Sequence, residues 1–198
     1  TIALNVLMIT NTYLPQVGGV AVSVDRFTRK YRALGHRVLV VAPSYGQQPS
    51  EERGVLRVPA IHDFNGSDFS VSLPVPKMLG EALDDFGPEV VHSHHPFLLG
   101  NAALRIAAQR RIPTVFTHHT MYEEYTHYVP VNSGLLKRYA AEISTRYANL
   151  CDQVIAPSES TASLLIARGV RSPVNVVPTG VETGRFSDGD GERFRELQ

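Results

Sequence analysis

Residues 89–120 read EVVHSHHPFLLGNAALRIAAQRRIPTVFTHHT, and this stretch decides the fold class. Residues 89–92 form a short apolar run of strand length, and residues 114–117 form a second run of the same kind. Between them, apolar residues recur at helical spacing: Leu98, Leu99, Ala102, Ala103, Ile106 and Ala107. A strand, a helix and a strand in this order indicate a βαβ unit with parallel strands.

The same alternation continues on both sides, which predicts an α/β fold with a mainly parallel sheet and helices on both of its faces. Further runs have the length and the Val and Ile content of strands: residues 5–10, 37–42, 54–58, 153–156 and 175–177. Helical stripes occupy residues 20–34 and 136–150, and another helix is expected from an N-cap at Ser158 to a stop at Gly169. Residues 44–53 and 62–75 show no pattern that assigns them to either class.

The composition is that of one sizeable domain, or one domain plus a fragment, in 198 residues. A chain of this length buries roughly 70% of its surface on folding and needs no disulfide or metal to hold a core. The 19 basic and 19 acidic residues balance, which argues against a nucleic-acid-binding protein. Because no apolar run approaches the ~20 residues of a membrane span and residues 1–4 lack a signal-peptide n-region, we expect a cytoplasmic protein.

The chemically unusual residues follow the predicted strands, at their carboxyl ends. Six of the eight histidines lie between residues 92 and 127: His92, His94, His95, His118, His119 and His127. Two glycine-containing turns, Gly18-Gly19 and Thr179-Gly180, follow the first and last strands. Ligands of open parallel sheets bind beyond the carboxyl ends of the strands, so the sequence predicts a binding site at this edge.

The Gly18-Gly19 pair stands directly before a predicted helix. Paired glycines let backbone amides approach a ligand closely, and a helix N-terminus favours phosphate. The spacing matches neither the dinucleotide-binding nor the P-loop motif. A tight turn between strand and helix is the alternative interpretation.

The histidines also raise the hypothesis of a metal site, since His92 and His94 are two residues apart and would point the same way on an extended chain. A third ligand could come only from His119 or Glu123, and no motif of a known metal site is present. We therefore expect no metal, and we expect uncharged histidines that form hydrogen bonds. Cys151 is expected to be a buried, unreactive thiol.

Lys137, Arg138 and Arg146 fall on one predicted helix and leave two interpretations open. They form either a solvated helix face or a contact with a membrane surface. In the first interpretation, which we favour, the apolar stripe of this helix faces the core.

Four motifs together resemble a known family. They are Pro15-x-x-Gly18-Gly19, His92-x-His94-x-Pro96, Phe116-Thr117-His118-His119-Thr120 and Thr179-Gly180-Val181-Glu182-x-x-x-Phe186. In this order and spacing they resemble the N-terminal half of family-4 glycosyltransferases, retaining enzymes of the GT-B architecture with two Rossmann-like domains. Residues 117–128, THHTMYEEYTHY, are most similar to diacylglycerol glucosyltransferases and related lipid-modifying members.

The resemblance implies transfer of a sugar from a UDP- or GDP-linked donor to a hydroxyl of a small molecule or lipid, with retention at the anomeric carbon and without a cofactor. It implies that residues 1–178 form the N-terminal, acceptor-side domain and that residues 179–198 are a linker and the start of a donor-binding domain. The chain alone is then expected to be inactive. Its expected location is cytoplasmic, or peripheral at the inner face of the cell membrane.

The resemblance also implies roles for individual residues. His119 is the expected catalytic contact with the transferred sugar. The donor side is expected at Gly18, Gly19, Thr179 and Gly180, the acceptor side at Glu123, Tyr125, His127 and Tyr128, and the cleft floor at His92, His94 and Pro96. Two other classes remain open from the residues: a metal-dependent hydrolase that uses the histidines, and a sugar- or lipid-headgroup-binding module without enzymatic activity.

Overall fold

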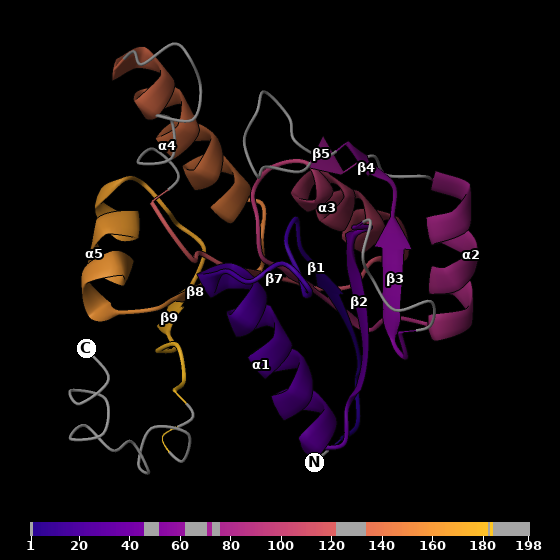
Figure 1. Cartoon of the computed structure of the whole chain (residues 1–198). Helices are drawn as coiled ribbons and strands as arrows, with labels where there is room; N and C mark the ends of the chain where they lie inside the picture. Colours follow the sequence, from indigo (N-terminus) through magenta and orange to yellow (C-terminus); the bar gives the residue numbers. More distant parts are fainter. Residues whose placement is uncertain are drawn as a thin grey trace, which may run out of the picture.

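The computed structural model describes residues 2–45, 52–61, 71–72, 76–121, 134–181 and 183. Within these ranges the main sheet has seven strands, all parallel, in the order β3-β2-β1-β6-β7-β8-β9 (Figure 1). The strands are β1 Asn5–Ile9, β2 Arg37–Pro43, β3 Val55–Val58, β6 Val90–Ser93, β7 Thr114–Thr117, β8 Gln153–Ala156 and β9 Val174–Val176. This confirms the predicted parallel α/β fold.

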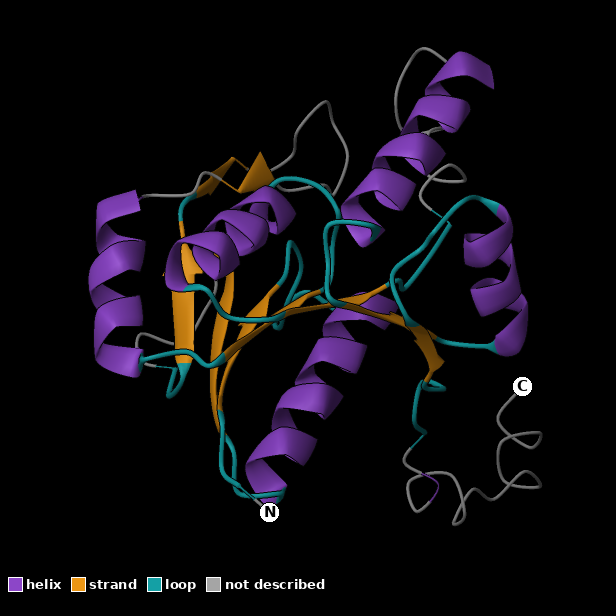
Figure 2. Cartoon of the chain, turned by 180° about the vertical axis from the view of Figure 1, so that it is seen from behind, coloured by secondary structure: helices purple, strands orange, loops and turns teal. Residues whose placement is uncertain are grey.

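The helices divide unequally between the two faces of the sheet. They are α1 Gly19–Ala33, α2 Pro76–Phe86, α3 Leu99–Arg110, α4 Gly134–Ala148 and α5 Glu159–Ala167. Crossovers between parallel strands are right-handed, and the one through α1 runs toward β2 while the later ones run the opposite way along the sheet. Among the described residues, α1 is therefore alone on its face, and α2, α3, α4 and α5 lie on the other (Figures 1 and 2).

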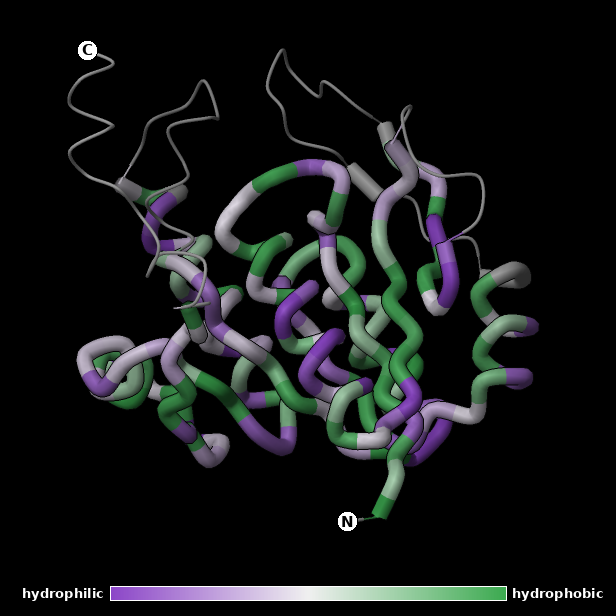
Figure 3. The backbone as a smooth tube through the Cα atoms, turned by 60° about the horizontal axis from the view of Figure 1, so that its bottom comes forward, coloured by the Kyte–Doolittle hydropathy of each residue, from purple (hydrophilic) through white to green (hydrophobic). Residues whose placement is uncertain are grey.

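Hydrophobic clusters follow this division. Under α1, residues of β1 and β2 form one cluster with Val24, and on the opposite face Leu7 and Ile9 of β1 pack with α2 and α3 in a second cluster. The third cluster joins Phe116 and Val154 to α4 and α5. In Figure 3 hydrophobic residues run through the central strands, while the helices alternate between hydrophobic and hydrophilic positions as amphipathic helices do.

The helix ends agree with the signals in the sequence. α1 is followed by Gly35, whose positive φ of 91° is a backbone conformation that glycine adopts readily. At the start of α5 the Ser158 hydroxyl accepts a hydrogen bond from the Thr161 amide, which confirms the predicted N-cap.

Two segments differ from the sequence predictions. α2 was not predicted, although Pro76 is a good first helical residue and Leu79 and Leu83 share one buried face. β4 Ala60–Ile61 and β5 Val71–Ser72 form a small antiparallel pair, part of which falls where no assignment was made.

The prediction that the apolar stripe of residues 136–150 faces the core is wrong at two positions, because Tyr139 and Leu150 are 60% and 69% exposed, whereas Tyr147 is buried. Leu135, at the N-terminal end of α4, is 76% exposed. The reason is geometric, because α4 extends away from the sheet and only its last turns pack on it (Figure 2).

Candidate active-site cleft

The register of the sheet places a column of residues on the α1 side. Met8 of β1, His92 of β6 and Val115 of β7 are register partners, and Met8 packs in the cluster under α1. Because side chains alternate along a strand, His94 and Thr117 project to the same side. The ring of Phe27 on α1 confirms this, since its centroid lies 5.3 Å from that of His92 and 6.0 Å from that of His94.

A cavity of about 180 Å³ opens on this side of the sheet, between α1 and the chain that leaves β9. Its lining comes from four parts of the sequence: Ser23, Arg26, Phe27 and Lys30 of α1, Thr117 and His119, Pro157, and Val177, Pro178, Thr179 and Gly180. The predicted catalytic residue His119 and the predicted donor residues Thr179 and Gly180 therefore meet in one cleft.

His119 is held in this cleft by a second histidine. Its Nε2 lies 2.8 Å from Nδ1 of His94, so one proton is shared between the two rings, which stack at 5.1 Å. Burial, with a smaller contribution from the neighbouring His118, lowers the pKa of His119 to about 4. At neutral pH the imidazole is thus uncharged and can donate or accept a hydrogen bond, according to its tautomer, at the ring nitrogen that His94 does not occupy.

His92 packs against His94 on the side away from His119. Its Nε2 lies 2.7 Å from Thr117 Oγ1, its Nδ1 lies 3.3 Å from the Tyr31 hydroxyl, and its ring centroid is 4.2 Å from that of His94. Burial lowers the pKa of His92 to about 3, and the positive charge that His119 would carry adds to this effect. The three histidines form a neutral, stacked column, and of these only His119 lines the cavity. That His92, His94 and Pro96 shape the cleft floor stays a prediction.

The turn after β6 is fixed by close packing against α3 and α4. A Cβ on Gly100 would lie 2.0 Å from the His95 carbonyl oxygen, so only glycine fits there. The Tyr147 hydroxyl lies 2.7 Å from Ser93 Oγ and 3.0 Å from the Gly100 carbonyl oxygen. Pro96 is buried within this turn. These contacts set the direction in which the chain carries His94.

His118 points away from the cleft, as expected for the neighbour of His119 on an extended segment. It is buried, and its ring meets that of Phe116 edge-on at 6.0 Å. The two adjacent histidines therefore belong to different environments.

Gly18 and Gly19 lie at the N-terminal end of α1, one turn before Ser23 in the cleft wall. Gly18 is the N-cap with an extended φ of −166°, and a Cβ on either glycine would meet no atom of the described residues within 4 Å. Neither steric crowding nor a positive φ explains the pair, and this leaves the amides open to an incoming ligand.

Sequence reasoning missed the basic residues of the cleft. Arg26 and Lys30 line it together with Ser23, and a guanidinium nitrogen of Arg26 donates to the Gly180 carbonyl oxygen. All three lie on one stripe of α1, next to the apolar stripe that predicted the helix. A polar stripe on an amphipathic helix is normally exposed to solvent. The position of the residues that follow β9 shows that this stripe lines the cleft instead.

Several predictions lie outside the described residues: Glu123, Tyr125, His127 and Tyr128, and with them Glu182 and Phe186. In the part of the chain that is described, no three His, Cys, Asp or Glu side chains are grouped so that they could hold a metal ion. Cys151 is buried, and burial raises the pKa of its thiol to about 12, so it is an unreactive thiol at neutral pH. No helix in the described ranges is long and apolar enough to cross a membrane.

Comparison with known proteins agrees with the fold. The model of Glycosyltransferase Family 4 matches residues 17–185, and the chain belongs to this family. Among solved structures, sucrose-phosphate synthase from Thermosynechococcus elongatus superimposes with a TM-score of 0.71 at 15% identity, over 98% of this chain and 52% of that one. Anabaena Alr3699/HepE in complex with UDP and glucose superimposes with a TM-score of 0.63 at 16% identity, over 98% and 50%. These likenesses establish the GT-B type of fold.

Two curated relatives are similar over nearly the whole chain. An alpha-monoglucosyldiacylglycerol synthase of Streptococcus pneumoniae is 28% identical over 96% of this chain and 44% of its own length. A GDP-mannose-dependent alpha-mannosyltransferase of Mycobacterium tuberculosis is 32% identical over 92% of this chain and 49% of its own length. The chain thus spans about half the length of the curated relatives it matches.

Proposed function

We propose that this chain is the acceptor-side half of a retaining glycosyltransferase, which transfers a sugar from a nucleotide sugar to an acceptor hydroxyl. The observation that carries the proposal is the cleft beside α1, where the neutral His119 faces the same cavity as Arg26 and Lys30. A reaction of this class needs a hydrogen-bonding group at the sugar and positive charge near the departing diphosphate.

In the proposed mechanism His119 acts through hydrogen bonding rather than proton transfer. With a pKa of about 4, the ring of His119 is uncharged at neutral pH and lacks the second ring proton that a general acid would donate. The neutral ring can still hold a sugar hydroxyl by a hydrogen bond. His94 holds the ring in one orientation, which reduces the entropy lost when the sugar binds. The exposed amides at Gly18 and Gly19 and the cation of Lys30 then stabilise phosphate charge as it develops.

The names of the two curated relatives support the choice of donor and acceptor: one depends on GDP-mannose, and the other makes a glucosyldiacylglycerol. We infer a UDP- or GDP-linked sugar as donor, with no cofactor, and a diacylglycerol-type lipid as acceptor. A second domain, beginning after residue 178, would supply the other contacts with the nucleotide. This proposal favours a transferase over a metal-dependent hydrolase, for which no group of three His, Cys, Asp or Glu side chains is found in the described residues.

A lipid acceptor requires contact with a membrane surface, and α4 offers one. Its exposed N-terminal half combines Leu135 and Tyr139 with the basic residues Lys137 and Arg138. An amphipathic, basic helix of this kind binds at the interface of anionic membranes. We therefore place the protein at the inner face of the cell membrane, on the cytoplasmic side, as a peripheral protein.

The test uses the full gene product, incubated with UDP-glucose or GDP-mannose and with diacylglycerol in mixed micelles. The proposal expects a glycolipid whose new linkage has the α configuration of the donor, as read by NMR of the purified product. The 198-residue chain alone, measured in parallel, is expected to melt cooperatively and to transfer no sugar. A β-linked product would contradict retention, and hydrolysis in place of transfer would contradict the proposed class.

A further inference from the structure

A second cavity, of about 580 Å³, lies at the opposite edge of the sheet from the cleft. It is bounded by the end of α1, the start of β2, the turn before β3 and the last residue of α2. Its lining is Arg32, His36, Arg37, Val38, Leu39, Arg53, Gly54 and Phe86. Three arginines therefore face one cavity that the proposed glycosyl transfer does not use.

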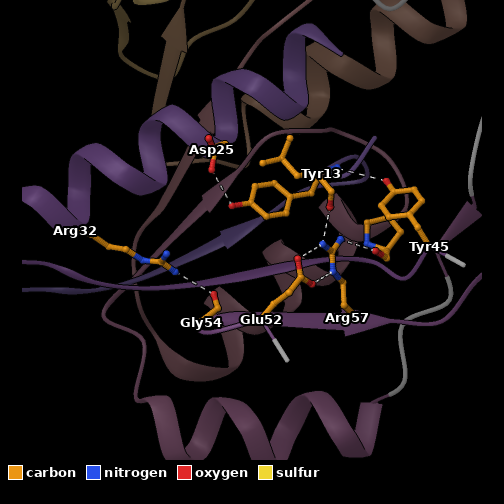
Figure 4. Close-up of polar contacts among 9 residues, drawn as sticks. Tyr13, Asp25, Arg32, Tyr45, Glu52, Gly54 and Arg57 are labelled. Atoms are coloured by element: carbon orange, nitrogen blue, oxygen red, sulfur yellow. Dashed lines mark hydrogen bonds and ion pairs between the residues drawn. The ribbon is translucent and has the colours of Figure 1, made fainter. Parts of the chain in front are cut away.

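Arg32 reaches this cavity beside the backbone of Gly54. Its guanidinium donates to the carbonyl oxygen of Val38 at 3.1 Å. It also donates to the carbonyl oxygen of Gly54 at 3.3 Å (Figure 4). A Cβ on Gly54 would lie 2.5 Å from that guanidinium nitrogen, and the residue has a positive φ of 74°. The turn before β3 is thus shaped around a cation, and the same guanidinium keeps further N–H groups for a ligand.

Arg37 is placed by an aromatic ring. Its guanidinium carbon lies 5.3 Å from the ring centroid of Phe86 at the end of α2, within the range of a cation–π contact. The guanidinium carries five N–H donors, and an oxyanion that enters the cavity can accept hydrogen bonds from them.

His36 adds a donor. Its Nδ1 accepts a hydrogen bond from the Leu4 amide at 3.1 Å, so the proton of the neutral ring resides on Nε2.

The three arginines of this cavity differ from the neighbouring Arg57 in their ion pairs. Among the described residues, no carboxylate forms an ion pair with Arg32, Arg37 or Arg53. Arg57 shows the contrast, because both oxygens of Glu52 bind its guanidinium, at 2.5 and 2.6 Å (Figure 4). The C-terminal ends of α1 and α2 contribute about half a negative charge each, which is less than three full positive charges.

From this geometry we propose that the cavity is a binding site for a phosphate-bearing anion with two or more negative charges. Guanidinium groups match phosphate oxygens with paired N–H donors, and several arginines around one cavity favour a multiply charged anion over a single carboxylate. The volume lies in the range of small-molecule sites and leaves room for a group attached to the phosphate. A soluble phosphate ester and a phospholipid headgroup share this chemistry. The proposal is independent of the proposed glycosyl transfer.

The first experiment titrates the 198-residue chain with pyrophosphate and follows the backbone amides by NMR. Pyrophosphate could also bind at the N-terminal end of α1 near Gly18. The residues whose amide signals shift therefore distinguish the two sites. The proposal expects saturable shifts at residues 36–39 and 53–54, which weaken as salt is added. Shifts confined to residues 18–30, or no shifts at all, would overturn it.

Variants of Arg37 and Arg53 sharpen this test, because within the described ranges neither guanidinium bonds to a backbone carbonyl as that of Arg32 does. Arg37→Gln and Arg53→Gln are each expected to weaken binding at residues 36–39 about tenfold, the scale of one charge-assisted hydrogen bond. Arg105→Gln removes the same charge from the exposed side of α3 and is the matched control. Equal affinity in all three variants would contradict the site.

The second experiment separates the two sources of phosphate. The chain is sedimented with vesicles of phosphatidylglycerol and phosphatidylcholine in equal parts, and with vesicles of phosphatidylcholine alone. Binding to the anionic vesicles that Arg37→Gln and Arg53→Gln both reduce, while Arg105→Gln does not, identifies a lipid headgroup. Vesicle binding that these variants leave unchanged, together with pyrophosphate binding that they weaken, identifies a soluble phosphate ester.

Discussion

On the α1 side, β1 and β2 are covered by that helix and share a hydrophobic cluster with it, whereas among the described residues β7, β8 and β9 have no member in that cluster. The covered half packs hydrophobic clusters against both faces of its strands. The other half packs one cluster, on the side of α4 and α5. The cleft lies at the boundary between these two halves. The stacked histidines lie on β6 and directly after β6 and β7.

The comparison shows how one sheet separates stability from ligand binding. In the covered half, residues on both faces are apolar and serve the core. At β6 and β7 polar side chains appear on the side of α1: His92 is the register partner of Met8 in β1, and Thr117 follows Val115 by two residues in β7. The strand order also reverses direction between β1 and β6, which is the point where open α/β sheets bind ligands.

The largest effect on stability is expected at the turn that joins these halves. Gly100→Ala places a methyl group 2.0 Å from the His95 carbonyl oxygen, and the backbone must shift, at a cost of about 3 kcal/mol in the free energy of unfolding. Urea unfolding measures it. Gly18→Ala is the matched control, because its methyl group meets no described atom, and equal losses in both variants would refute the packing described for the turn.

A pair of truncations compares the two halves directly. Leu7 of β1 is fully buried in the cluster with α2 and α3. Leu7→Ala is expected to lower the free energy of unfolding by about 3 kcal/mol. Ile155→Ala, partly buried on the α1 side of β8, is expected to cost about 1 kcal/mol. Both are measured by urea unfolding. A loss for Ile155→Ala as large as that for Leu7→Ala would mean that the second half is packed as densely as the first.

The histidine column predicts a loss of stability in acid. In the unfolded chain a histidine takes up a proton as the pH falls below about 6.5, whereas His92 and His119 stay neutral in the folded chain until pKa values of about 3 and 4. Protonation therefore favours the unfolded state, by about 2 kcal/mol per histidine at pH 5 relative to pH 7.

Unfolding free energies across this pH range provide the measurement. His92→Asn should reduce the number of protons taken up on unfolding at pH 5 by about one, whatever its own stability. Proton uptake that this substitution leaves unaltered would show that His92 titrates normally in the folded chain.

Local patterns predicted most of the fold because strands and helices here follow the ordinary hydrophobic periods. Each main strand was predicted to within about one residue. α2 escaped because only Leu79 and Leu83 mark its buried face in a short polar segment, and the exposure of Leu135 and Tyr139 depends on how far α4 reaches beyond the sheet.

The site was predictable in part for the same reason. The alternation of a strand predicted that His118 and His119 point apart, and the order of strand ends predicted that the histidines gather at one edge. The hydrogen bond between His94 and His119 and the entry of Arg26 and Lys30 into the cleft depend on strand order and on the path after β9, which the local sequence does not encode.

The most direct test of the cleft is the turnover of His119→Ala in the full gene product. The account predicts that kcat falls at least about 100-fold, the scale of one hydrogen bond lost in the transition state, while the protein remains folded. His118→Ala, on the opposite side of the same segment, is the control and should lower stability but keep turnover at temperatures where it is folded. A folded His119→Ala variant with the kcat of the unmodified protein would contradict the central claim.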